Sequence, residues 1–156
     1  KEGDTFMTAD TNARKSTPGW VAQVLDRPAT AGLGRSLLTL PFWYSGIGKL
    51  LDFEAATQEA AGFGLSPAPL VAAATIAVQL LGSALVILRR WPWLGAGALI
   101  VFVLMAIPVA HPFWQMEGAQ RHYQLMWVAE HTGLIGGLIL AAVLGGRPDS
   151  GGRQPG

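Results

Sequence analysis

Residues 67–110 have the sequence PAPLVAAATIAVQLLGSALVILRRWPWLGAGALIVFVLMAIPVA, in which only Arg89 and Arg90 carry a charge. More widely, no Asp, Glu, Lys or Arg occurs from residue 60 to residue 88 or from residue 91 to residue 116. A helix needs about 20 largely apolar residues to cross a hydrocarbon core of ~30 Å. This stretch therefore predicts two membrane-spanning helices, joined at the arginine pair.

Two further apolar stretches flank this region, so that four spans are predicted, at residues 36–51, 67–88, 93–110 and 123–144. The first span is short and contains Pro41, but Lys49 near its end is long enough to snorkel to the membrane surface. None of the four stretches alternates polar and apolar residues over ten positions, as a membrane β-strand does. The expected fold class is all-α, an integral membrane four-helix bundle.

The composition of the whole chain agrees with a membrane protein. Of its 156 residues 51% are hydrophobic and 13% are charged, against about 25% charged residues in soluble domains. The chain has no cysteine, which excludes disulfides and thiolate metal sites, and its formal net charge of +1 gives no basic footprint for nucleic acid. We therefore expect the lipid bilayer and other membrane or membrane-associated subunits as partners, with no nucleic acid and no metal.

The basic residues near the span ends are distributed unequally. One side of the membrane has six arginines near the span ends, which are Arg27, Arg35, Arg89, Arg90, Arg147 and Arg153. The other side has only two basic residues, Lys49 and Arg121. The positive-inside rule then places both termini in the cytoplasm of a bacterial inner membrane protein, with residues 52–66 and 111–122 as outer loops.

Outside the spans the sequence changes character. Residues 1–32 are predicted to be a polar, partly disordered arm, in which GWVAQVLD (residues 19–26) has apolar side chains at the spacing of a short amphipathic helix. Residues 147–156 are rich in glycine and polar residues and are predicted to be disordered. The four-helix domain is therefore expected at residues 33–146.

Glu130 and His131 are the most informative residues, because they lie about 12 Å from the start of the fourth span. Ionisable groups at that depth are expensive, so they normally face a cavity or the bundle interior. Gln79 and Lys49 are polar partners on other predicted spans. Three interpretations stay open: hydrogen bonds that hold helices together, a cavity that binds a polar head group such as a quinone or relays protons, and a metal or haem ligand role for His131.

The predicted outer loop HPFWQMEGAQRHYQ (residues 111–124) gathers further ionisable groups near the end of the fourth span. They are candidates for a lid or a docking surface over the site, namely His111, Glu117, Arg121 and His122. An ordinary interfacial loop is the alternative interpretation.

Three glycines give the fourth span a smooth surface, Gly133, Gly136 and Gly137. Such small residues let helices approach closely, either within one chain or between two proteins. Phosphate-binding glycine loops, serine nucleophile motifs and HExxH are absent from the sequence, which leaves nucleotide binding and hydrolysis without support.

Residues 35–146 resemble the DoxX family of small four-helix bacterial membrane proteins. The resemblance lies in the segments SGIGKLLDF (residues 45–53), GFGLSPAP (62–69), AVQLLGSALVIL (77–88), HPFW (111–114) and EHTGLIGGLIL (130–140). The family often has Glu at the position of Gln79. The resemblance implies a subunit associated with membrane redox chemistry, because some members are similar to the membrane subunit of a thiosulfate:quinone oxidoreductase.

Two functions are compatible with these observations. The first is an accessory or anchoring subunit of an inner-membrane redox complex, with a quinone-type site formed by Lys49, Gln79, Glu130 and His131, so that any enzyme activity belongs to the complex and any cofactor is a quinone. The second is a non-enzymatic subunit that packs on a larger membrane complex through its glycines. A solute transporter has little support, because inverted repeats are not visible.

Overall fold

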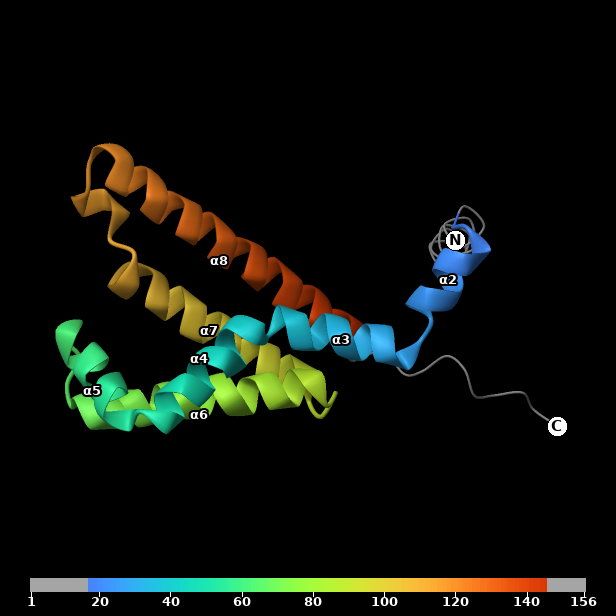
Figure 1. The fold of residues 1–156 in the computed structure, drawn as a ribbon, viewed down its shortest axis with the longest axis horizontal. Coiled ribbons are helices and arrows are strands. Elements are labelled where there is room, and N and C mark those ends of the chain that lie inside the picture. The colour runs from blue at the N-terminus through green and yellow to red at the C-terminus, as the bar shows by residue number, and fades with distance from the viewer. Residues whose placement is uncertain (1–16, 146–156) are drawn as a thin grey trace, which may run out of the picture. The chain divides into compact units, whose positions relative to one another are not determined.

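The computed structural model describes residues 17–145, which form seven α-helices and one short 3-10 helix and contain no strand. The chain divides into two compact units, residues 1–34 and 35–156. The predicted disordered tail and the first part of the predicted arm lie outside the described residues. The helices, labelled in Figure 1, are α2 Gly19–Leu25, α3 Pro28–Leu38, α4 Leu40–Leu51, α5 Phe53–Gly62, α6 Ala68–Ile87, α7 Pro92–Ala110, η1 Phe113–Gln115 and α8 Gly118–Gly145.

The described part of the first unit contains α2 and the start of α3. Helix α2 forms where the spacing of apolar residues predicts a short helix, and its Trp20 and Leu25 side chains are exposed. The Thr30 hydroxyl donates a hydrogen bond of 2.6 Å to the carbonyl oxygen of Val24, across the turn between α2 and α3. This bond fixes the connection between the two helices.

The prediction of four helices is wrong in number, and the first predicted span shows one reason. It is divided at Thr39 between the end of α3 and all of α4. Pro41 lies in the first turn of α4 and has no N–H to donate to the carbonyl of Leu37, so it cannot continue α3. The buried Thr39 hydroxyl donates instead to the Arg35 carbonyl at 2.8 Å, which stabilises the break.

The predicted outer loop at residues 52–66 contains another helix, α5. The Asp52 carboxylate caps this helix by accepting a hydrogen bond of 2.9 Å from the backbone N–H of Ala55. Ala56 and Ala60 are buried, and α5 packs against α4 and α6 (Figure 1). A helical segment therefore packs beside α6 and α4 in place of the expected loop.

Three helices are long and apolar enough to cross a membrane: α6, α7 together with η1 (Pro92–Gln115), and α8. These agree with three of the four predicted spans. A tight connection joins α6 to α7, in which Arg89 and Trp91 adopt positive φ values of 57° and 53°. Helix α7 packs between α6 and α8, since it has extensive contacts with both.

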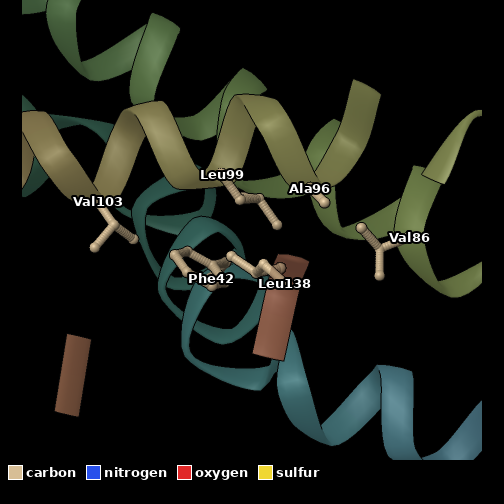
Figure 2. Close-up of a cluster of buried hydrophobic side chains, with 6 residues drawn as sticks. All are labelled: Phe42, Val86, Ala96, Leu99, Val103 and Leu138. Atoms are coloured by element: carbon tan, nitrogen blue, oxygen red, sulfur yellow. The ribbon is translucent and has the colours of Figure 1, made fainter. Parts of the chain in front are cut away.

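The core gathers buried side chains from four helices (Figure 2). Helix α7 supplies Ala96, Leu99 and Val103, and these meet Phe42 of α4 and Leu138 of α8. Close backbone contact between α6 and α7 depends on two glycines, because a Cβ atom on Gly95 would lie 2.7 Å from the backbone oxygen of Gly82. The opposite surfaces of these helices remain exposed, as expected for side chains that face lipid.

Candidate functional site

A cavity of about 420 Å³ lies among helices α4 to α8. This volume falls within the range of small-molecule sites, about 300–1,000 Å³. Most of the lining is apolar, and the polar or charged lining residues are Ser45, Lys49, Glu59, Thr75, Gln79 and His131. The cavity is therefore suited to a largely apolar molecule with a few polar groups.

Gln79 is one of the residues that line the cavity, and it lies about 16 Å along α6 from the start of this helix. The residue is only 4% exposed, and its side-chain oxygen Oε1 has no hydrogen-bond partner. An unpaired buried polar atom costs about 1–3 kcal/mol. A molecule bound in the cavity could offset this cost by supplying a hydrogen-bond donor. Gln79 is therefore a candidate for contact with a bound molecule.

Lys49 reaches the cavity from the last turn of α4, where it forms an ion pair with Glu59 of α5. The Lys49 side chain is 18% exposed and the Glu59 side chain 51% exposed, so the pair connects the cavity to the surface. The side chains of Phe63, Met105 and Val109 line the cavity and are exposed as well. This part of the rim is apolar, which would allow entry from the lipid phase.

His131 brings an imidazole to the cavity from α8. Its Nδ1 atom lies 2.7 Å from the backbone oxygen of Trp127. Because a carbonyl oxygen only accepts, Nδ1 carries the hydrogen, and Nε2 of the neutral ring is free to accept a hydrogen bond or a proton. The ring centroid of His131 lies 5.0 Å from that of His111.

His111, at the end of α7, is the one predicted outer-loop candidate that lies beside the cavity residues. Its Nδ1 atom lies 2.6 Å from Oε1 of Gln124, and its ring stacks on Trp127 with a centroid distance of 6.2 Å. These contacts fix the orientation of the ring in the same way as for His131. The imidazole rings of His111 and His131 thus lie in contact, edge to face, between the end of α7 and helix α8.

The structure does not bring the other predicted residues into the cavity. Glu130 lies on the exposed surface of α8 and does not line the cavity, although it is adjacent in sequence to His131. The remaining outer-loop candidates are exposed and lie outside the lining, Glu117, Arg121 and His122. Within residues 17–145, no group of three or more His, Cys, Asp or Glu side chains is arranged to hold a metal ion.

The predicted packing glycines also separate into two kinds. A Cβ atom on Gly137 would lie 2.6 Å from Cδ1 of Leu38, so this glycine faces a neighbouring segment of the same chain. Around Gly133 and Gly136 there is open space. Besides Gly137, the described chain has glycines in close contact with neighbouring segments at Gly46, Gly82, Gly95 and Gly145.

Sequence reasoning missed Glu59 and the polar stripe of α6. Thr75, Gln79 and Ser83 are spaced four residues apart and share one helix face, which was a detectable signal. Thr75 and Gln79 line the cavity, whereas Ser83 is buried outside it. Glu59 falls in a predicted outer loop, and its pairing with Lys49 depends on the helical fold of α5.

Comparison with known families identifies the family of this chain. A family model described as DoxX matches residues 31–112, just over half of the chain. The chain belongs to the DoxX family. The match includes α4 to α7 and ends before α8, so the part of this DoxX protein that carries His131 lies beyond it. No curated protein and no solved structure matches the chain.

Proposed function

We propose that this DoxX protein is an accessory or anchoring subunit of a redox complex in the bacterial inner membrane and contributes a quinone-type binding site. The observation that carries the proposal is the apolar cavity lined by Gln79, a residue whose buried Oε1 atom has no hydrogen-bond partner in the described chain. Lys49 and His131 are the other two predicted site residues among the polar residues that line the cavity. Glu130, on the exposed surface of α8, is left out of it.

The chemistry of the cavity suits a quinone head group. A quinone has an apolar ring and two polar oxygen atoms, and it reaches its site through the lipid phase, as the exposed apolar rim would permit. Reduction to the quinol adds two electrons and two protons. His131 and His111 are placed to hold protons beside the cavity, and imidazole is well suited to proton transfer near neutral pH.

The electrons would have to come from another subunit. The sequence contains no cysteine and no dinucleotide-binding glycine motif, so it offers no thiol relay and no recognisable flavin site. An accessory role fits this composition. In such a complex the DoxX subunit holds the quinone in the membrane, and its partner supplies the redox centre.

Quinone binding to the purified full-length chain tests the site directly. We expect a long-chain quinone to quench the tryptophan fluorescence of the protein, and Gln79→Leu and His131→Ala to weaken its affinity about tenfold each, which corresponds to ~1.4 kcal/mol. Ser83→Ala is the matched control, since Ser83 is also a buried unpaired polar residue of α6 but lies outside the cavity. Equal affinity in all four folded proteins would rule out this site.

A second candidate function is that of a purely structural subunit, which the exposed surface of α8 favours. Only Leu138 of α8 is buried, and Gly133 and Gly136 leave open space on this helix. In this case Gly133→Leu would abolish co-purification with the complex, whereas Gln79→Leu and His131→Ala would leave the activity of the complex unchanged. Loss of activity in the two cavity variants, with assembly intact, would exclude the structural role alone.

A further inference from the structure

The position of Glu130 indicates what kind of partner binds α8. This carboxyl group lies 12 residues after the start of α8, on its exposed surface, and no other residue of the described chain pairs with it. Ionisable side chains at such a depth in a membrane span normally pair with another group or face a water-filled cavity. A glutamate is also too short to reach the interface as lysine and arginine do. Glu130 therefore needs a partner from outside the described chain, and the hydrocarbon of the lipid cannot supply one.

The surface next to Glu130 is shaped for a second helix. Ala129, Gly133, Gly136 and Leu140 follow one another at intervals of four, three and four residues and are all exposed, so they form a seam along α8. A Cβ atom on Gly133 or Gly136 would meet nothing within 4 Å. Small residues in this pattern allow the backbone of another membrane helix to approach closely. Such a helix would bring its own side chains to the depth of Glu130.

Such a helix could come from a second copy of this chain or from a different protein, and the charge of Glu130 favours the second source. A second copy of this chain, related by a two-fold axis along the membrane normal, would place one Glu130 opposite the other, and a second carboxyl group supplies no positive charge to pair with the first. A helix from a different protein is free to carry a basic side chain at that depth. We infer that the α8 seam binds a transmembrane helix of another membrane protein, which pairs a lysine, arginine or histidine side chain with Glu130.

This inference rests on the accessory role in the proposed function, but its test needs no known partner. The probe is a synthetic polyleucine helix of about 20 residues with one central lysine, compared with the same helix without it. Energy transfer is measured from the labelled full-length chain to the labelled probe in phosphatidylethanolamine and phosphatidylglycerol vesicles. We expect the lysine probe to bind at least about tenfold more tightly than the all-leucine probe.

Two variants and a control make the result specific. Glu130→Gln and Gly133→Leu should reduce the preference for the lysine probe to less than about twofold. Gly97→Leu is the matched control, because Gly97 of α7 also has open space around its Cβ position but lies on another helix. It should keep the preference. Equal binding of both probes to the unmodified chain, or a preference that survives Glu130→Gln, would overturn the inference.

The remaining outcomes separate this inference from the proposed function. Energy transfer between two differently labelled copies of the chain, abolished by Gly133→Leu, would identify a second copy as the occupant and overturn the assignment to another protein. Quinone binding is measured on the same preparations. If the quinone binds and the preference for the lysine probe is absent, the inference is wrong and the proposed quinone site is supported. If the quinone does not bind and the lysine probe is preferred, the quinone site is wrong and the proposed surface for a partner helix is supported.

Discussion

At the scale of single residues, the ion pair between Lys49 and Glu59 is the contact most open to measurement. Glu59 is half exposed, and exposed pairs contribute about 0–1 kcal/mol. The two side chains of this ion pair differ in their surroundings, because Lys49 is more buried than Glu59. Both line the mostly apolar cavity. We expect Glu59→Gln to lower the free energy of unfolding by about 1 kcal/mol, since it leaves a half-buried ammonium group unpaired, and Lys49→Met to lower it less.

Unfolding in mixed micelles, measured for both single variants and the double variant, checks this expectation. The double variant should be no less stable than Glu59→Gln alone, because the unpaired ammonium group is then gone. Losses that simply add up would mean that the two side chains act independently and that the pair contributes nothing to stability.

Gln79 and Lys49 both line the cavity, and the sequence alone predicts that these two polar side chains face inward. Polar residues inside apolar helices are expensive, so the sequence alone predicts an inward orientation for them. It does not predict the orientation of Glu130 and His131. Adjacent helix positions differ by about 100°, so at most one of the two faces the centre of the bundle, and the contacts of α7 with α8 decide which.

At the scale of helices, the glycines on α7 and α8 provide a direct comparison. A methyl group on Gly95 would meet the backbone oxygen of Gly82 and Cβ of Leu85, each at 2.7 Å, and neither is the end of a flexible side chain. Such overpacking costs about 1–3 kcal/mol. We expect Gly95→Ala to lower the thermal midpoint clearly. Gly133→Ala, which adds its methyl group in open space, should keep or slightly raise it.

Thermal unfolding of the two variants in the same detergent decides whether α6 and α7 pack as described. A Gly95→Ala protein as stable as the unmodified chain would contradict the close contact between these helices. Binding of the quinone to Gly133→Ala should stay unchanged, because Gly133 lies outside the cavity lining.

The helices also show where sequence patterns reach their limit. The three long spans could be predicted because uninterrupted apolar runs of this length have few other stable folds. The division at Thr39 depends on Pro41, which is visible in the sequence, but a proline in a span either bends a helix or ends it. Helix α5 is too short and too polar to appear as a membrane span, although its Ala, Glu and Gln residues favour a helix.

At the scale of the whole molecule, the path of residues 35–60 decides how many times the chain crosses the membrane. The Arg35 side chain donates a hydrogen bond of 3.2 Å to the carbonyl of Ile87, at the end of α6. Gly46 meets Leu80 and Gln79 near the middle of that helix, and Ala60 of α5 lines the same cavity as Ala72 near its start. Together with the packing of α5 against α6, these positions follow α6 from its last turn to its first turns.

A segment that accompanies a membrane-spanning helix along its length should cross the membrane with it, even though α4 alone has only 12 residues. Together with α6, α7 and α8, we therefore expect four crossings, which would place both termini on one side. Three crossings would place them on opposite sides. By the positive-inside rule, the excess of arginine near the termini predicts that this common side is the cytoplasm.

Reporter fusions distinguish the two topologies. We expect a fluorescent protein to mature when fused to either terminus. We expect alkaline phosphatase to be active when inserted in the connection between α5 and α6 or in the connection between α7 and α8, and inactive at either terminus. Exchange of Arg89 and Arg90 for glutamine should weaken this orientation, because these residues contribute two of the charges that hold the α6–α7 connection in the cytoplasm. Active phosphatase at the N-terminus together with a fluorescent C-terminus would show that α3 and α4 do not cross, and that the cavity lies against a segment that enters and leaves the membrane on the same side.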